Sequence, residues 1–238
     1  GSFAPVWSKA RYLQACHAII DHIRAGDIYQ TNLSQPFAGR LGDGDTPFDL
    51  FRRLTANSPA PHGAWLRLSP DRVVVTNSPE RFLRLATGTV EARPIKGTRP
   101  RGGTPEEDAA LKAELADSAK DRAETLMIVD LMRNDLSRVC APGSVTVPEL
   151  FKVESYANVH HLVSAVSGRL AEGKDALDLL AAAFPPGSIT GAPKLRAMDI
   201  LSDQEGEPRG AYCGALGWIG NGAQSMDFNV MIRTLTLI

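Results

Sequence analysis

Residues 64–93 read AWLRLSPDRVVVTNSPERFLRLATGTVEAR, and this stretch decides the fold class. It holds short apolar runs, rich in valine and leucine, that are separated by the turn residues Asp71 and Thr87-Gly88. Such runs are typical of β-strands, and the short breaks between them favour antiparallel neighbours. We expect strands at residues 64–68, 72–76, 81–86 and 89–93.

Helices and further strands surround this stretch. Apolar spacing and capping signals such as Thr46-Pro47 and Thr104-x-x-Glu107 predict helices at residues 8–25, 48–56, 104–116, 118–139, 175–184 and 193–201. Further strands are predicted at residues 28–38, 145–147, 150–155, 162–170, 211–219 and 225–237, the last two as a hairpin around Gly220-Asn221-Gly222. Because strands and helices do not alternate regularly, the pattern indicates an α+β fold with largely antiparallel sheets.

The chain is expected to be a single domain over residues 1–238. Residues 1–7 are interpreted as a cloning remnant and leader, because the chain starts with Gly1-Ser2. An apolar strand pattern runs to Ile238 without a cap, so we also expect the domain to be incomplete at its C-terminus.

Composition argues against several function classes. The chain has 238 residues and a formal net charge of −1, with no basic excess, so neither nucleic acid nor a membrane is an expected partner. No apolar run is long enough for a transmembrane helix. The three cysteines are widely spaced, which fits a reducing cytoplasm better than a disulfide framework or a zinc site.

Two ionisable residues are candidates for catalysis. Lys96 lies beside Gly97 at the expected end of a strand, and a partly desolvated lysine there would be a nucleophile. Glu80 follows an apolar strand near a turn and would be a general acid if it were buried. The alternatives are a surface lysine and a turn-capping carboxylate.

Carboxylates on one predicted helix are candidate metal ligands. Glu124 and Asp135 share a helix face, and Asp130 lies among apolar neighbours. Oxygen ligands of this kind suit Mg²⁺. The alternative is a solvated face with an intrahelical pair from Asp130 to Arg133.

Two regions are candidate anion sites. The glycine-rich turn at residues 184–194 leads into a helix and offers backbone N–H groups to a phosphate or carboxylate. Arg233, predicted on a strand, is suited to clamping a carboxylate. His160 and His161 precede an apolar strand, where alternation predicts that one faces the core and the other faces away. Together, the candidate acid, amine, metal ligands and anion sites suit a small polyanionic substrate.

Five motifs resemble the chorismate-utilising enzyme family: PIKGTRPRG, DLMRNDLSRVC, FPPGSITGAPKLRAMDIL, YCGALGW and DFNVMIRT. The resemblance covers the chain from about Ala10 to its end. It implies an α/β sandwich of largely antiparallel sheets flanked by helices, which binds chorismate with Mg²⁺ in a cleft. It also implies that the family's C-terminal Gly-Ala-Gly turn and two further metal-binding glutamates are missing from this chain.

The resemblance assigns roles to individual residues. Glu80 matches the general acid, His161 a catalytic histidine near the substrate ring, and Glu124 a magnesium ligand. The implied substrate-binding residues are Gln30, Thr98, Ser188, Thr190, Gly191, Tyr212 and Arg233, of which Tyr212 and Arg233 match the pair that holds the enolpyruvyl carboxylate. Gln30 occupies the position of a lysine that activates water in the isochorismate branch, so ammonia is the expected nucleophile here.

Lys96 is expected to set the product. In the branch that reads PIKGT, the family mechanism makes this lysine a covalent nucleophile, and ammonia then converts chorismate to 4-amino-4-deoxychorismate for p-aminobenzoate and folate synthesis. The branch that usually reads PIAGT forms anthranilate for tryptophan synthesis, and this is the enzymatic alternative. The other alternative is a non-catalytic fragment that binds chorismate or an amidotransferase. The chain has no Cys-His glutaminase signature, so a separate glutamine amidotransferase subunit is the expected source of ammonia.

Overall fold

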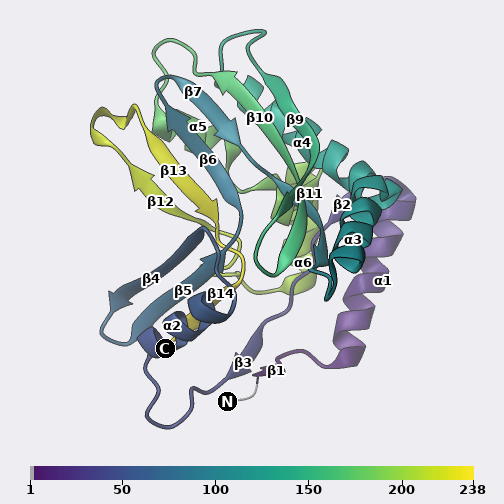
Figure 1. Cartoon of the computed structure of the whole chain (residues 1–238), viewed down its shortest axis with the longest axis vertical. Helices are drawn as coiled ribbons and strands as arrows, with labels where there is room; N and C mark the ends of the chain where they lie inside the picture. The colour runs from purple at the N-terminus through teal and green to yellow at the C-terminus, as the bar shows by residue number, and fades with distance from the viewer. Residues whose placement is uncertain (1–2) are drawn as a thin grey trace.

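Two antiparallel sheets form the framework of the computed structural model, which describes residues 3–238 (Figure 1). The larger sheet runs in the order β12-β13-β6-β7-β10-β8, and β9 also pairs with β10. Its strands are β6 (Arg81–Ala86), β7 (Thr89–Ala92), β8 (Ile95–Pro100), β9 (Thr146–Ser155), β10 (Val159–Arg169), β12 (Ala215–Ile219) and β13 (Met226–Val230).

The smaller sheet has the order β14-β5-β4, and its strands are β4 (His62–Ser69), β5 (Arg72–Ser78) and β14 (Thr234–Leu237). The remaining strands form two short two-stranded sheets. β1 (Phe3–Pro5) pairs with β3 (Phe37–Gly39), and β2 (Gln30–Thr31) pairs with β11 (Gly191–Ala192). The β2–β11 pair matters most for function, because it joins the N-terminal quarter of the chain to the glycine-rich turn.

Six α-helices and two 3₁₀ turns complete the described elements. They are α1 (Lys9–Ala25), α2 (Pro47–Asn57), α3 (Pro105–Asp117), α4 (Ala119–Ser137), α5 (Ala176–Ala183), η1 (Gly187–Ile189), α6 (Lys194–Glu205) and η2 (Asn221–Ala223). Local capping explains their starts: the Ser8 side chain accepts from the Arg11 N–H, and Thr46 and Asp49 form a capping box. Thr104 caps α3 in the same way, although Glu107 bonds the Gly103 N–H instead of closing the box.

The main core lies between the larger sheet and helices α4 and α5, which are drawn behind that sheet in Figure 1. Leu83 and Val166 from the strands, Leu136 from α4 and Leu179 from α5 are fully buried. Burying each such side chain contributes about 1.5–3 kcal/mol to folding. This packing fixes the larger sheet and α4 relative to each other.

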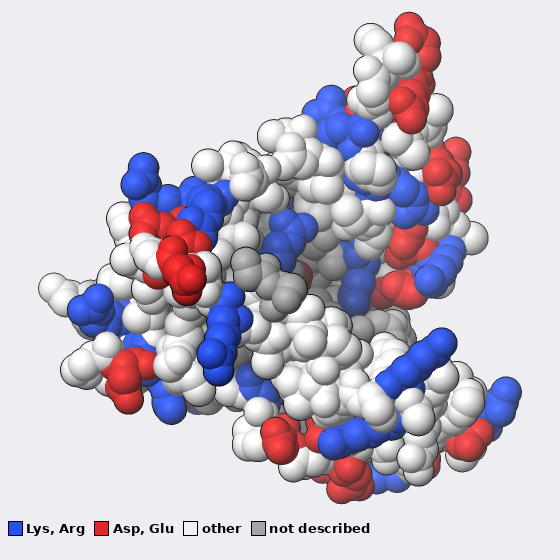
Figure 2. All heavy atoms as spheres, turned by 90° about the horizontal axis from the view of Figure 1, so that it is seen from below, with Lys and Arg blue, Asp and Glu red and all other residues white. Residues whose placement is uncertain are grey.

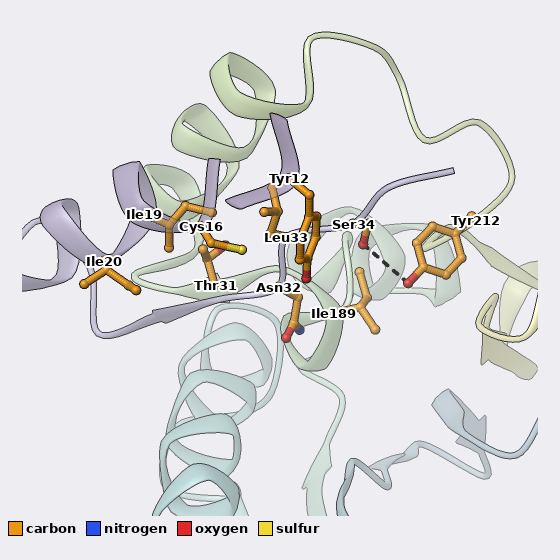
Figure 3. A pocket seen from close by; sticks show the side chains of 10 residues that line it. All are labelled: Tyr12, Cys16, Ile19, Ile20, Thr31, Asn32, Leu33, Ser34, Ile189 and Tyr212. Carbon is orange, nitrogen blue, oxygen red and sulfur yellow. Dashed lines mark hydrogen bonds between the residues drawn. The ribbon is translucent and has the colours of Figure 1, made fainter. Parts of the chain in front are cut away.

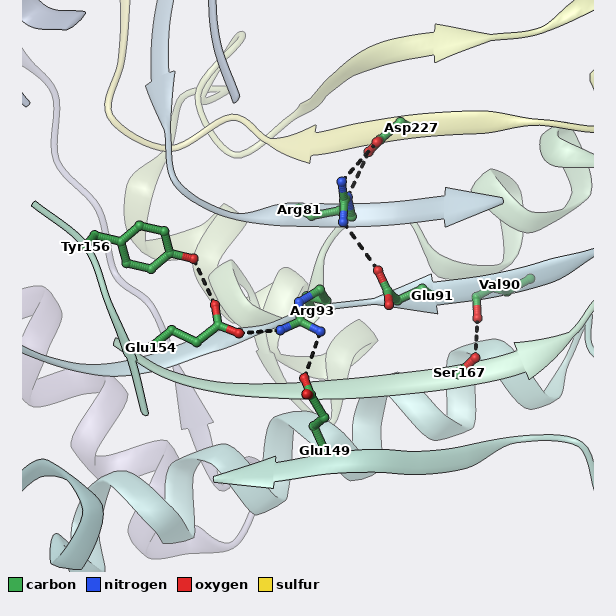
Figure 4. A network of polar contacts seen from close by, with 9 residues as sticks. All are labelled: Arg81, Val90, Glu91, Arg93, Glu149, Glu154, Tyr156, Ser167 and Asp227. Carbon is green, nitrogen blue, oxygen red and sulfur yellow. Dashed lines mark hydrogen bonds and ion pairs between the residues drawn. The ribbon is translucent and has the colours of Figure 1, made fainter. Parts of the chain in front are cut away.

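A polar network ties neighbouring strands of the larger sheet together (Figure 4). Arg81 forms ion pairs with Asp227 at 3.0 Å and with Glu91 at 3.3 Å. Arg93 bonds Glu149 at 2.9 Å and Glu154 at 2.5 Å. The network therefore links β6, β7, β9 and β13, and through Glu154 it reaches the residues around His161.

The structure confirms the α+β class and largely antiparallel sheets, and it corrects several local predictions. The strand predicted at 28–38 is two short strands, β2 and β3, joined by irregular chain. The strand predicted at 225–237 is also two strands, because the chain turns at Arg233 (φ 50°) and passes from the larger to the smaller sheet. Residues 95–100 form β8, so Lys96 lies within a strand. The runs at 145–147 and 150–155 are one strand, β9.

The leader predicted for residues 1–7 lies partly outside the described residues, at positions 1 and 2. Residues 3–5 form β1, and Trp7 is buried, so residues 3–7 take part in the fold. On the face shown in Figure 2, basic and acidic side chains are interspersed. Within residues 3–238 no helix has both the length and the apolar character to cross a membrane.

Candidate active site

Glu80 lies in the tight connection between β5 and β6, where the chain passes from the smaller sheet to the larger one. Its side chain is buried, with a relative exposure of 4% for the residue. The Ser188 hydroxyl donates a 2.7 Å hydrogen bond to Glu80 Oε1. Burial raises the pKa of Glu80 to about 7, against the opposing effects of Ser188 and Lys96. The carboxyl can therefore hold a proton near neutral pH, as a general acid must.

Lys96 lies on β8 and points toward the same serine. Its Nζ donates a 2.9 Å hydrogen bond to the Ser188 carbonyl oxygen. Burial lowers the pKa of Lys96, although the nearby charges of Glu80 and Glu124 oppose that shift. The pKa of Lys96 falls and that of Glu80 rises for the same reason: burial favours the neutral amine of Lys96 and the neutral acid of Glu80. Ser188 thus connects the acid, in the β5–β6 connection, to the amine on β8.

A glycine next to Lys96 lets β8 lie close to the helices. Gly97 has φ +79°, and a Cβ atom there would lie 2.9 Å from Leu115 and 3.0 Å from Asp121. A side chain at this position would force β8 away from the junction of α3 and α4. Gly97 therefore helps to set how deeply Lys96 is buried.

Ser188, Thr190 and Gly191 form a buried loop made of η1 and β11. Gly191 pairs with Thr31 across the short two-stranded sheet, and Ala192 pairs with Gln30. A Cβ atom on Gly191 would lie 2.3 Å from the Gln30 carbonyl oxygen, so only glycine fits this approach. The pairing brings four of the predicted substrate-binding residues to one place: Gln30, Ser188, Thr190 and Gly191.

His161 lies on β10, opposite Thr98 on β8. Its Nδ1 is 2.9 Å from Thr98 Oγ1, and the Tyr156 ring packs against it at 5.6 Å between centroids. Burial, and then the charge of Arg233, lower the pKa of His161. The neutral imidazole is therefore the favoured form.

The prediction that only one of the two histidines faces the interior is wrong. His160 is fully buried too, because α3 covers that side of the sheet. It bonds Asp108 at 3.0 Å and Ser155 at 2.8 Å, which satisfies both ring nitrogens within the structure.

Arg233 and Tyr212 lie on different segments. Arg233 is exposed in the turn between β13 and β14, not on a strand, and its charge acts on His161. Tyr212 borders a cavity of about 510 Å³ between α1, β2 and η1 (Figure 3). There its hydroxyl accepts a 3.5 Å contact from Ser34. That Tyr212 and Arg233 hold one carboxylate together stays a prediction.

The carboxylates of α4 do not gather into a complete metal site. Glu124 is half-buried, interacts with Lys96, and lies 3.9 Å from Lys120. Asp130 is exposed and pairs with Arg133 at 3.2 Å, as the surface alternative predicted. Asp135 is buried but bonds Lys194 at 2.5 Å. Within residues 3–238 no group of three His, Cys, Asp or Glu side chains could hold a metal ion.

Sequence reasoning missed two residues that support this site. Asn32 donates its side-chain amide to the Ser188 carbonyl oxygen at 2.8 Å. Arg209 bonds the backbone carbonyls of Asn32 and Ile189 at 2.6 Å and 3.0 Å. Neither residue carries a local sequence signal that separates it from an ordinary loop residue.

Comparison with known proteins identifies the family of this chain. A family model described as "chorismate binding enzyme" matches residues 1–237. Aminodeoxychorismate synthase component 1 of Klebsiella aerogenes is 50% identical over 230 residues, which cover 96% of this chain and 50% of that protein. Anthranilate synthase component 1 of Streptomyces coelicolor is 44% identical over 234 residues, which cover 97% of this chain and 44% of that protein.

A solved structure shares the fold. Anthranilate synthase component I from Streptococcus pneumoniae superposes with a TM-score of 0.88 at 35% identity, over 99% of this chain and 51% of that one. The chain belongs to the chorismate binding enzyme family. It spans about half the length of the curated relatives it matches.

Proposed function

We propose that this chain supplies the acid and the nucleophile of an enzyme that aminates chorismate with ammonia to 4-amino-4-deoxychorismate, a step toward p-aminobenzoate and folate. The observation that carries the proposal is the Ser188 bridge between Lys96 and Glu80. Relatives named aminodeoxychorismate synthase component 1, at about 50% identity, support this choice within the family.

The first step joins Lys96 to the substrate. The neutral amine of Lys96 attacks the ring carbon next to the carboxylate-bearing carbon and becomes a secondary ammonium, both conjugated ring double bonds shift, and the C4 hydroxyl leaves. Glu80 donates its proton to that hydroxyl, so that water departs instead of hydroxide. The buried environment of both residues favours the protonation states that this step requires.

The second step reverses the shift. Ammonia attacks C4, both ring double bonds shift back, and the bond from Lys96 to carbon breaks. Lys96 departs from its ammonium adduct with the electron pair of the broken C–N bond and is again a neutral amine. The new C4 ammonium loses one proton, and this proton restores the acid form of Glu80. The net reaction consumes chorismate and ammonia and releases the amino product and water, with the enolpyruvyl group retained.

The other predicted residues bind and orient the substrate. Gln30, Ser188, Thr190 and Gly191 form one wall, and Thr98 with His161 forms the part of the site near the ring. Arg233 supplies a positive charge beside His161, which suits an enolpyruvyl carboxylate. Gln30 has no titratable amine, so it cannot activate water in place of ammonia.

The predicted Mg²⁺ would be held in part by Glu124. A single half-buried carboxylate does not form a magnesium site, although Mg²⁺ sites commonly use one or two carboxylates together with substrate oxygens and water. When bound, the ion would neutralise carboxylate charge on the substrate. The residues present therefore fit only part of a site, and no step of the proposed reaction depends on the metal.

A glutamine amidotransferase subunit is the proposed ammonia donor, as the name "component 1" of the relatives suggests for those proteins. Cytoplasmic location stays a prediction, since relatives from rice and Arabidopsis thaliana are named as chloroplastic.

Product analysis tests the proposal. The complete natural polypeptide that contains this chain is given chorismate, Mg²⁺ and ammonium, and products are identified by mass spectrometry with a coupled assay for pyruvate. An amino product that retains its enolpyruvyl group, without pyruvate, is the expected result. Anthranilate with pyruvate would instead support the tryptophan-branch alternative, and binding of chorismate without turnover would support a non-catalytic role.

A further inference from the structure

The Ser188 carbonyl oxygen accepts two hydrogen bonds in this structure. Lys96 Nζ donates one at 2.9 Å, and Asn32 Nδ2 donates the other at 2.8 Å. A carbonyl oxygen has two lone pairs, so the two donors together use its full capacity. The hydroxyl of the same residue bonds Glu80. The orientation of Ser188 therefore sets where the amine lies relative to the acid.

We propose that Asn32 is a positioning residue for Lys96. Its side-chain amide fixes the Ser188 carbonyl group, and that carbonyl group holds the lysine amine at a set position relative to Glu80. The inference rests on the proposed function, in which Lys96 is the nucleophile. Nothing in the family motifs assigns Asn32 this role, and it touches neither Lys96 nor Glu80 by hydrogen bond.

The backbone around Asn32 is held firmly enough for this role. Arg209 donates to the carbonyl oxygens of Asn32 and Ile189, so one guanidinium links the residue after β2 to the residue after Ser188. Glu205 forms a buried ion pair with Arg209 at 2.6 Å and also accepts from the Ser34 N–H at 2.9 Å. A planar, doubly bonded guanidinium restricts both backbones more than a single contact would.

A neighbouring hydrogen bond provides a matched control. Thr31 Oγ1 donates to the Thr190 carbonyl oxygen at 3.0 Å. Thr31 is the last residue of β2 and directly precedes Asn32, so this bond reaches the same loop, but its acceptor does not hold Lys96. Thr31→Val and Asn32→Leu each remove one side-chain donor without a large change in volume, so they separate general loosening of the loop from loss of lysine positioning.

The test is a double-mutant cycle in the complete polypeptide. Initial rates with chorismate, Mg²⁺ and ammonium are measured for Asn32→Leu and Thr31→Val, each alone and combined with Lys96→Ala. We expect Asn32→Leu to lower the amination kcat at least tenfold with KM for chorismate within about twofold, because misplaced reacting groups lose rate steeply. Thr31→Val should stay within about twofold. In the Lys96→Ala background, Asn32→Leu should change the residual rate by no more than about twofold.

The outcomes separate the two proposals. An equal loss from Asn32→Leu in both backgrounds, or a loss no larger than that of Thr31→Val, would overturn the positioning role alone. Full amination by Lys96→Ala, or no amination by the parent protein, would overturn the proposed function and the role of Asn32 with it. If Asn32→Leu fails to fold, Asn32→Asp keeps the size and removes the donor, and it is expected to lose at least as much kcat.

Discussion

Replacing Glu80 with glutamine removes a carboxyl group that the fold buries almost completely. Burial raises its pKa from 4.5 to about 7, so the folded protein holds a proton that the unfolded chain releases between those values. The stability associated with that proton is fully present below pH 4.5 and is lost as pH rises through 7. Glutamine keeps the shape and accepts from Ser188, but it cannot ionise.

The size of the effect follows from the shift. At about 1.4 kcal/mol per pKa unit, a shift from 4.5 to about 7 amounts to roughly 3 kcal/mol, of which roughly 2–3 kcal/mol falls between pH 5 and pH 8. The parent protein should therefore lose that much free energy of unfolding between pH 5 and pH 8 through this group, and Glu80→Gln should not. The difference in free energy of unfolding, variant minus parent, should rise by the same amount over this range. The variant should lose turnover at the same time, with chorismate affinity nearly unchanged.

Urea unfolding of both proteins at pH 5 and pH 8 measures this difference, and other titrating groups cancel because both proteins contain them. Glu172→Gln, at an exposed position, provides the baseline for losing a surface glutamate. A parent-to-variant difference that is the same at both pH values would refute the reasoning, because it would mean that the folded protein does not hold Glu80 at a raised pKa.

Three further predictions concern neighbouring groups. Lys96→Ala should lower formation of 4-amino-4-deoxychorismate by about 100-fold or more and allow some anthranilate. Lys96→Arg should not restore activity, because arginine stays protonated. An unchanged product and rate, measured by mass spectrometry, would argue against the covalent role. Arg233→Ala should raise KM for chorismate with a smaller effect on kcat, as loss of uniform binding does; steady-state kinetics would contradict this if kcat alone fell. Lys194→Met should lower the free energy of unfolding by about 3 kcal/mol at neutral pH, because it leaves the buried Asp135 carboxylate unpaired. The pKa of Asp135 is raised by burial, so this loss should shrink as acid neutralises the carboxyl, and thermal unfolding at two pH values checks it.

Local sequence signals predicted most of the elements well. Apolar periodicity and side-chain caps located all six α-helices of residues 3–238 to within a few positions, because those signals act over three or four residues. The strands between residues 62 and 92 were also found, since their alternation and turns are local. The strand predictions fail where pairing between distant segments decides whether a segment becomes a strand. One example is β8, whose sequence around Gly97 resembles a loop until it pairs with β10.

The candidate site shows the same division. Motifs singled out Glu80, Lys96 and His161, but the sequence left open whether Glu80 and Lys96 are buried. Asp130 and Asp135 were equivalent candidates in the sequence, yet one is exposed and the other is paired with Lys194. Asn32 went unnoticed, because a side chain that acts through a backbone carbonyl of a distant loop has no local signature.

The sequence by itself determined the helices, most of the strands, the family motifs and the presence of an acid and an amine, since each depends on the residue types at nearby positions. Only the tertiary structure decided that Ser188 meets Lys96, 92 positions away, and Glu80, 108 positions away. Only the packed fold could shift the two pKa values, because desolvation is the sum of contacts from many segments. The chemistry proposed for this chain depends on that burial as much as on the residues themselves.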